Sequence, residues 1–237
     1  MKLNNKRTIL VGLAFLSICA FWQMYDSVVP LILTKTFHMN ETFSGAIMAA
    51  DNILALFLLP FFGSLSDRSH SKIGKRMPFI LFGTGCAVIL MNILPLLDNS
   101  YAAQPSGLKT ASFVIVLGLL LVAMGTYRSP AVALMPDVTP KPLRSRANAI
   151  INLMGAVGGI LYLGVAAVLY PNSKSAGLEH VNYQPLFIVV SAIMFIAIAV
   201  LFLTVKEPKL TAENQALEKQ HPEWNLAQDD GSGHETL

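Results

Sequence analysis

Two carboxyl groups, Asp26 and Asp51, lie inside long apolar stretches of the sequence. Ionisable side chains are costly within a membrane, so each marks a candidate functional position. The two stretches run in opposite directions, and at a helical rise of 1.5 Å per residue both carboxylates lie about 10 to 12 Å below the outer boundary. We therefore expect one shared cavity, where a carboxylate binds a coupling cation or contacts a substrate. The alternative is simple solvation in a water-filled vestibule.

Other polar side chains accompany these acids. Trp22 can stack on a flat face of a substrate or serve as apolar packing. Arg128 either extends toward the nearer interface or faces inward. Its depth matches that of Asn148 and Asn152, so we expect no direct pair with Asp26 in one static state. The candidate residues for a substrate or coupling ion are Asp26, Asp51, Asn52, Gln23, Tyr25, Arg128, Asn148 and Asn152.

One face of the fifth apolar stretch carries Asn148, Asn152, Gly155 and Gly159 at helical spacing. Amide side chains both donate and accept hydrogen bonds, as sugar hydroxyls require. The two glycines form a pattern of small residues that suits close contact between helices.

A charge-rich stretch, GSLSDRSHSKIGKRMPFI at residues 63–80, separates two apolar stretches. Gly63 and Gly74 permit tight turns at helix ends. Asp67 can accept hydrogen bonds from free backbone amides at a helix N-terminus. Basic residues in short connections also set membrane topology, which explains part of the charge but not the order of the residues.

The elements that must position these residues follow from composition. Of the 237 residues, 54% are hydrophobic and 13% are charged, and the mean hydropathy is +0.55. A helix needs about 20 mostly apolar residues to cross a membrane. The sequence therefore predicts an all-α membrane protein with six transmembrane helices, at roughly 9–33, 43–62, 78–97, 111–134, 147–170 and 185–205.

Lys and Arg are distributed unevenly among the connections. Thirteen of the 17 lie in the N-terminal segment, the second and fourth connections and the tail. Such residues are enriched on the cytoplasmic side, so we expect both termini to be cytoplasmic. The net charge of +3 then reflects topology and implies no nucleic-acid partner.

The chain divides into a six-helix transmembrane bundle at 1–205 and a polar cytoplasmic tail at 206–237. We expect the tail to be solvated, with a short helix at about 211–220 and a disordered end. Cys19 and Cys86 fall inside predicted spans, so neither a disulfide nor a metal site is indicated.

The order of residues in the 63–80 stretch resembles the signature loop of the major facilitator superfamily, G-x-L-S/A-D-R-x-G-R/K-R/K. Ser69, His70, Ser71 and Lys72 enlarge the usual turn by four residues. The longer form, D-R-x-x-x-x-x-G-R/K-R-x-P-F/Y, is similar to the glycoside-cation symporter and sucrose-transporter (solute carrier 45-like) branch.

A second stretch, RSPAVALMPDVTPKPLRSRANAIINLMG at 128–155, resembles the same branch. Members show Pro-Ala-x-Ala-Leu-x-x-Asp, a short loop, and then Arg-x-x-Ala-Asn-Ala or a near variant. The match departs at Val132, where sucrose carriers commonly have Arg, so a sucrose-specific site is not implied.

The resemblance implies a latch that closes the cytoplasmic side, formed by Asp67, Lys75 and Asp137. The corresponding gating-loop residues are Gly63, Asp67, Arg68, Gly74, Lys75, Arg76 and Asp137. Family members have two six-helix bundles with the site between them, and the partner amides for Asp67 come from the second bundle. We expect a truncated or split product, a half that joins a separately encoded half, or a half that dimerises. The tail resembles the central linker.

The resulting hypothesis is half of a secondary active transporter in the cell membrane. It would carry a sugar or glycoside with a proton or sodium ion, by alternating access. The alternatives are an exporter of drugs or other small molecules, and a non-transporting remnant or membrane interaction subunit. No catalytic constellation, phosphate-binding loop or ligand cluster predicts an enzyme, a cofactor or a metal. The expected partners are the lipid bilayer, the substrate, the ion and a second six-helix half.

Overall fold

The computed structural model describes residues 3–171, 178 and 180–226. Within these residues, six helices are long and apolar enough to cross a membrane, so the predicted all-α membrane bundle is confirmed. Such helices satisfy their backbone hydrogen bonds internally. The helices are α1 (Asn5–Leu31, continued by a π-helical turn at Ile32–Thr36), α2 (Glu41–Asp67), α3 (Met77–Ala103), α4 (Gly107–Val138), α5 (Arg144–Leu169), α7 (Gln184–Thr204), α8 (Glu207–Gln220) and α9 (Glu223–Leu226).

Several helices extend beyond the apolar stretches predicted for them. For example, α4 occupies Gly107–Val138 rather than 111–134. Polar residues outside the hydrocarbon continue the helix and provide its caps. The Asn4 side chain accepts a hydrogen bond from the Arg7 amide at 3.1 Å, and Asn40 accepts one from the Thr42 amide at 3.0 Å. Asn is among the preferred N-cap residues because its oxygen replaces a missing backbone acceptor.

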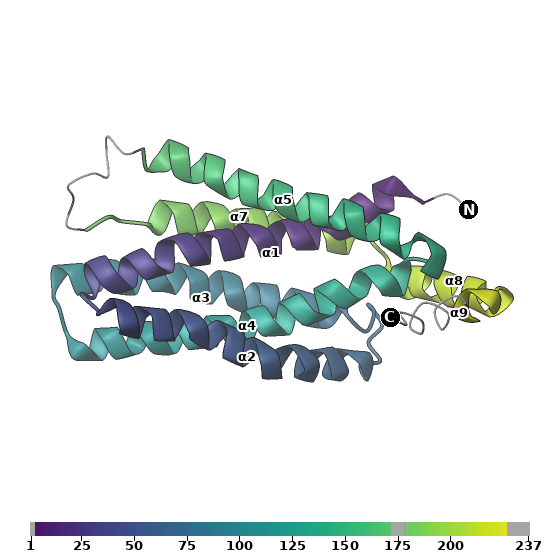
Figure 1. Cartoon of the computed structure of the whole chain (residues 1–237), viewed down its shortest axis with the longest axis horizontal. Helices are drawn as coiled ribbons and strands as arrows, with labels where there is room; N and C mark the ends of the chain where they lie inside the picture. The colour runs from purple at the N-terminus through teal and green to yellow at the C-terminus, as the bar shows by residue number, and fades with distance from the viewer. Residues whose placement is uncertain (1–2, 172–177, 179, 227–237) are drawn as a thin grey trace, which may run out of the picture.

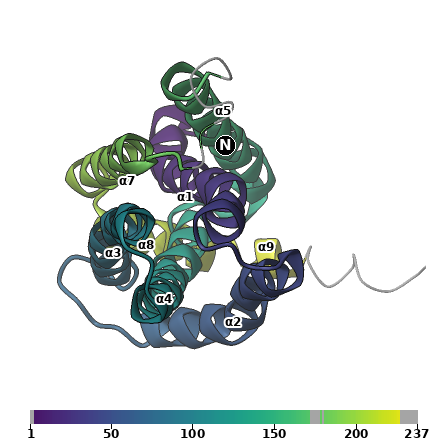
Figure 2. The ribbon, with the colours of Figure 1, turned by 90° about the vertical axis from the view of Figure 1, so that its left-hand side faces the viewer.

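Helix α1 runs through the middle of the bundle and packs closely against α5 (Figure 2). A Cβ on Gly158 would overlap the Leu16 carbonyl oxygen, and one on Gly155 would lie 2.9 Å from the Cys19 Sγ. The predicted contact pair was Gly155 and Gly159. Gly158 makes the tighter contact. The spacing identified one face of α5 but not the point at which α1 crosses that helix.

Tyr127 joins α1, α3 and α4 in the interior. Its side chain is fully buried, and its hydroxyl donates to the Ala14 carbonyl at 2.8 Å and pairs with the Ser17 hydroxyl. A Cβ on Gly83 of α3 would lie 2.8 Å from the Tyr127 amide nitrogen, so α3 and α4 pack backbone to backbone there. These contacts fix the register of α4, which carries Arg128 and Asp137.

Helix α2 lies at the edge of the bundle (Figure 2). None of its most apolar 18-residue window is buried, and large side chains such as Ile53, Leu56 and Phe57 are exposed. This surface suits a membrane environment, where lipid or another helix covers apolar side chains.

Several connections and helix α8 lie together at one end of the bundle. The start of α1, the connection between α2 and α3, the connection between α4 and α5, and α8 all lie at one end (Figure 1). We call this the α8 end and the opposite end the far end.

Candidate functional site

The two intramembrane carboxylates lie on neighbouring parts of α1 and α2. Asp26 is exposed, Asp51 is half-buried, and the two are within electrostatic range of each other. The buried Tyr25 is within range of both, and among the described residues its hydroxyl has no hydrogen-bond partner. Trp22, one helical turn before Asp26, lines a small cavity together with Asp51, whereas a cavity shared by both acids stays a prediction.

Of the two orientations that the sequence left open for Arg128, the structure describes the inward one. Its Cζ is 5.5 Å from the centre of the Trp22 ring, a cation–π geometry, and it lines the same small cavity as Asp51. The residue count predicted a depth near Asn148 and Asn152. That count locates only the Cα, whereas the long Arg side chain extends toward the middle of the bundle.

The cavity between Trp22, Asp51 and Arg128 has a volume of about 20 Å³. A single water needs about 10 to 15 Å³ by this measure, so the cavity is far too small for a sugar. The guanidinium also covers one face of Trp22, the surface on which a sugar was expected to stack. In this conformation, therefore, the ring is engaged by Arg128.

The amide candidates remain open to the surroundings of the chain. Gln23, Asn52, Asn148 and Asn152 are all exposed. The nearest heavy atom to a Cβ on Gly159 is the Gln23 Oε1, at 3.8 Å, so Gln23 lies along the seam between α1 and α5. Exposed polar groups within a span are unfavourable in lipid and require water or protein against them.

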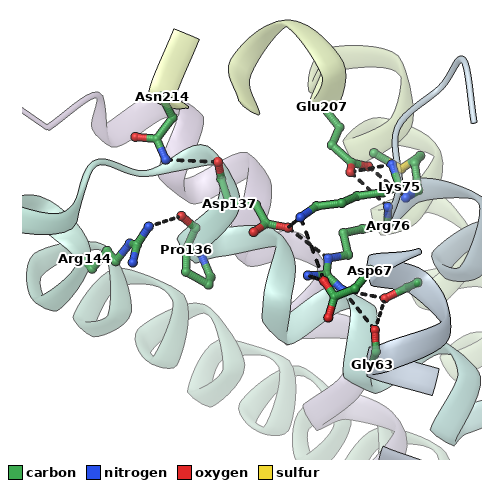
Figure 3. A network of polar contacts seen from close by, with 11 residues as sticks. Gly63, Asp67, Lys75, Arg76, Pro136, Asp137, Arg144, Glu207 and Asn214 are labelled. Carbon is green, nitrogen blue, oxygen red and sulfur yellow. Dashed lines mark hydrogen bonds and ion pairs between the residues drawn. The ribbon is translucent and has the colours of Figure 1, made fainter. Parts of the chain in front are cut away.

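A second polar site occupies the α8 end, centred on Arg76 (Figure 3). This side chain is only 5% exposed. Its Nε donates to the Asp137 Oδ2 at 2.9 Å, and its Nη1 donates to the Gly63 carbonyl at 3.3 Å and to the Ser66 hydroxyl. Its Nη2 pairs with Asp67. One guanidinium thus joins the end of α2, the start of α3 and the end of α4.

Lys75 adds a second cation to this network. Its Nζ lies 3.2 Å from the Asp137 Oδ2 and 3.9 Å from the Asp67 Oδ1. The predicted trio of Asp67, Lys75 and Asp137 is therefore assembled, although Arg76 is the more buried partner. Arg68 is exposed and stands outside these contacts.

The prediction that Asp67 accepts hydrogen bonds from the N-terminal amides of a helix in a second bundle stays a prediction. Asp67 is the last residue of α2, and within the described chain its recorded partners are the side chains of Arg76 and Lys75. These pairs lie inside the bundle, and 55% of the Asp67 side chain remains exposed.

Glu207 caps the N-terminus of α3, a role that the sequence did not predict. Its carboxylate accepts hydrogen bonds from the backbone amides of Lys75, Arg76 and Met77 at 2.8, 2.9 and 2.8 Å. Gly74 has a φ of 121°, and a Cβ there would overlap the carboxylate. Free amides and the helix dipole both favour an anion at this position.

A signal for such a cap was present in the sequence. Arg76 precedes the first residue of α3 and is not a capping residue type. A buried helix start without a local cap requires a distant acceptor, and Glu207 follows the last apolar stretch at the same side of the predicted membrane.

Helix α8 completes the network from the tail. The Asn214 amide donates to the Asp137 carbonyl at 3.1 Å, and Arg144 donates to the Pro136 carbonyl at 2.9 Å and to the Glu218 Oε1 at 3.0 Å. The tail was predicted to be solvated, with a helix at about 211–220. Instead, α8 begins at Glu207 and is docked through buried polar side chains. The predicted disordered end lies mostly at 227–237, outside the described residues.

Comparison with known proteins identifies related sequences. A family model described as Major Facilitator Superfamily matches residues 11–227. The sucrose transport protein SUC3 of Arabidopsis thaliana is 35% identical over 145 residues, which cover 56% of this chain and 24% of SUC3. The alpha-ketoglutarate permease of Escherichia coli (strain K12) is 27% identical over 179 residues, covering 74% and 38%.

Solute carrier family 45 member 3 of Homo sapiens is 26% identical over 185 residues, covering 76% of this chain and 33% of that protein. Across these relatives, the matched region spans between 24% and 38% of their length. Both polar sites described above lie within the residues that the family model covers.

Proposed function

Because the chain belongs to the Major Facilitator Superfamily, we propose that its six-helix bundle forms half of a cation-coupled carrier for a sugar or glycoside. The family consists of membrane carriers rather than enzymes, as the sequence predicted. The observation that carries the proposal is the presence of two carboxylates, Asp26 and Asp51, within the membrane-spanning helices α1 and α2. The names of the sucrose transport relatives support the choice of substrate class.

The carboxylate pair is the coupling site in this proposal. Two acids close together favour the binding of a proton or sodium ion between them, since neighbouring like charges disfavour a doubly ionised state. Asp26 is exposed on the open face of the bundle, where an ion can reach it. Uptake of the ion neutralises the pair and lowers the cost of a change in conformation.

The substrate site uses the exposed amides on α1, α2 and α5. Gln23, Asn52, Asn148 and Asn152 offer donors and acceptors for sugar hydroxyls. Arg128 leaves Trp22 when the sugar arrives, which frees the ring to stack. The 20 Å³ cavity then belongs to a conformation in which the sugar is not bound.

The Arg76 network is the gate in this proposal. It holds the connection between α2 and α3 against the end of α4, while Glu207 ties the same connection to α8. The α8 end carries most of the Lys and Arg residues, so we assign it to the cytoplasm together with both termini. Membrane-impermeant thiol labelling should then reach Lys219→Cys from the inside of a cell and Lys35→Cys from the outside. Labelling of both from one side would contradict this orientation.

A second six-helix bundle covers the polar face of α1, α2 and α5 and supplies the other wall of the substrate site. The exposure of Asp26 and Asn152 within membrane-spanning helices supports this assignment, because lipid is a poor environment for both side chains. Closing and opening of the two bundles about that face then gives alternating access.

Sugar counterflow in proteoliposomes tests the proposal. The chain is reconstituted alone and with a matching second bundle, and uptake of labelled sucrose, a glycoside and alpha-ketoglutarate is compared. We expect saturable counterflow of a sugar or glycoside only in the assembled form. An assembled protein that exchanges alpha-ketoglutarate and no sugar would overturn the substrate class. Absence of counterflow for every substrate would overturn the carrier assignment.

A further inference from the structure

A buried carboxylate at the far end of the bundle has no part in the sites above. Asp98, near the C-terminal end of α3, is 0% exposed. Among the described residues, neither of its carboxylate oxygens has a hydrogen bond of ordinary geometry. An isolated buried charge is costly unless a cation compensates it. The groups around Asp98 therefore determine whether it is tolerated as an anion.

His180, in the connection between α5 and α7, is the cationic candidate. Its Nε2 lies 4.0 Å from the Asp98 Oδ2 and 2.9 Å from the Asn99 Oδ1. Its Nδ1 lies 3.2 Å from the Thr36 hydroxyl at the end of α1. The imidazole thus bridges α1 and α3, and with 27% of its side chain exposed it can exchange protons with the solvent.

The residues after His180 also hold the segment before α7 against the end of α3. The Asn99 side-chain amide donates to the Asn182 Oδ1 at 2.9 Å, and that oxygen also accepts from the Gln184 backbone amide at 2.9 Å. The Tyr170 hydroxyl at the end of α5 donates to the Asn182 carbonyl at 2.7 Å. The start of α7 is therefore held by the end of α3 through this short segment.

We propose that His180 and Asp98 form a proton-operated clasp that fastens the segment before α7 to α1 and α3. In the neutral ring, Nε2–H donates to Asn99 and Nδ1 accepts from the Thr36 hydroxyl. A proton taken from the solvent at Nδ1 reverses the Thr36 contact, so that the ring donates to it, and adds attraction to the buried Asp98 carboxylate. The clasp is tight while the ring carries the second proton and the Asp98 carboxylate is ionised, and it loosens when the ring loses that proton.

Other titratable groups face this region. Tyr183 packs near Asp98; burial, assisted by the Asp98 charge, raises the pKa of Tyr183, so its hydroxyl stays neutral while an imidazole titrates. Lys109 is engaged with the Ser100 and Gln104 carbonyls at 2.8 Å. A neighbouring cavity of about 660 Å³ is lined by Lys35, His38, Tyr101 and His180. Of the basic groups that the structure describes, His180 is the one within 4.0 Å of Asp98.

Amide hydrogen exchange of the full chain in lipid nanodiscs tests the clasp without any transport assay. The rates for residues 180–187 are measured from about pH 5.5 to 8.5 and divided by the intrinsic rate at each pH. We expect the corrected rate to rise by about tenfold from the lowest to the highest pH. A tenfold change corresponds to the loss of an interaction of about 1.4 kcal/mol. In Asp98→Asn, the rise in rate should be smaller, because the charged ring no longer has an anionic partner.

His180→Gln retains hydrogen bonding but cannot take up the proton, so its profile should be flat. Exchange in the middle of α7 checks that each variant is folded. The matched controls are Glu179→Gln and Lys174→Gln, at positions outside the described residues, and both should keep the natural profile. Three results would overturn the clasp: a corrected exchange rate of the natural chain that does not depend on pH, an unchanged pH dependence in His180→Gln, or loss of the pH dependence in either control. Since no substrate is involved, these outcomes are independent of the proposed function.

Discussion

Three successive backbone amides at the start of α3 depend on the carboxylate of Glu207. We expect Glu207→Ala to lower the free energy of unfolding by about 3 kcal/mol, because buried donors lose their acceptor. Glu207→Gln retains one acceptor oxygen and should cost about 1 to 2 kcal/mol. Thermal unfolding in detergent measures both variants.

Glu213 on the same helix provides the matched control. It is exposed, and among the described residues its recorded partner is Lys209, at 4.0 Å, so Glu213→Ala should change stability by about 0.5 kcal/mol or less. Equal losses for the Glu207 and Glu213 variants would refute the cap.

Arg76 differs from the neighbouring basic residues in its burial and in its planar fork of donors. Arg76→Lys keeps the charge but cannot bond Asp137, Asp67 and the Gly63 carbonyl together. We expect a loss of about 2 to 4 kcal/mol, close to that for breaking a buried ion pair. Chemical unfolding measures the loss, and the exposed Arg68→Lys should be neutral. An Arg76→Lys protein as stable as Arg68→Lys would show that the network contributes little.

Part of each site could be predicted at the scale of single residues. Helical rise converts sequence position into depth, which is why Asp26 was grouped with Asp51; a cavity shared by both acids stays a prediction. The contact between Arg128 and Trp22 was not predicted, because the direction of a side chain depends on the packing of neighbouring helices. Glu207 was missed for a related reason: it contacts residues about 130 positions earlier in the chain, and no local pattern encodes such a pairing.

At the scale of helices, the close approach of α1 and α5 depends on Gly158. Its hydrogen faces the Leu16 carbonyl, and a methyl group would overlap that oxygen. We expect Gly158→Ala to force the helices apart and to cost about 1 to 3 kcal/mol, as overpacking does. Thermal unfolding of purified protein measures the effect.

Gly164 lies on the same helix and serves as the control. Within the described part of the chain, a Cβ there meets nothing within 4 Å, so Gly164→Ala should be neutral or stabilise the helix by up to about 1 kcal/mol. If both substitutions had the same effect, the α1–α5 contact would not be limited by the backbone approach.

The existence of the six spanning helices was predictable because each requires only a sufficiently long apolar stretch. The end of each helix was less predictable, since polar residues beyond the membrane continue the helix until a cap stops it. Gly158 was missed and Gly159 favoured because spacing identifies a face but not where a partner crosses it. The docking of α8 was not predicted, because its polar composition resembles that of a solvated segment.

For the molecule as a whole, the two polar sites lie at different levels of one bundle. Asp26 and Asp51 lie in the spanning part of α1 and α2, whereas the Arg76 network lies at the α8 end, where α2 ends. Helix α2 carries both Asp51 and Asp67, so a tilt of this edge helix would move the proposed coupling site and the proposed gate together.

The central claim is that Asp26 and Asp51 couple a cation to the movement of sugar. Its most direct test is gradient-driven sugar accumulation in proteoliposomes that contain the assembled carrier, under a proton or a sodium gradient. We expect accumulation with one of the two ions. Asp26→Asn and Asp51→Asn should each lower accumulation by at least about tenfold, the effect of about 1.4 kcal/mol, while sugar counterflow persists. Accumulation that is unchanged in both variants would contradict the account.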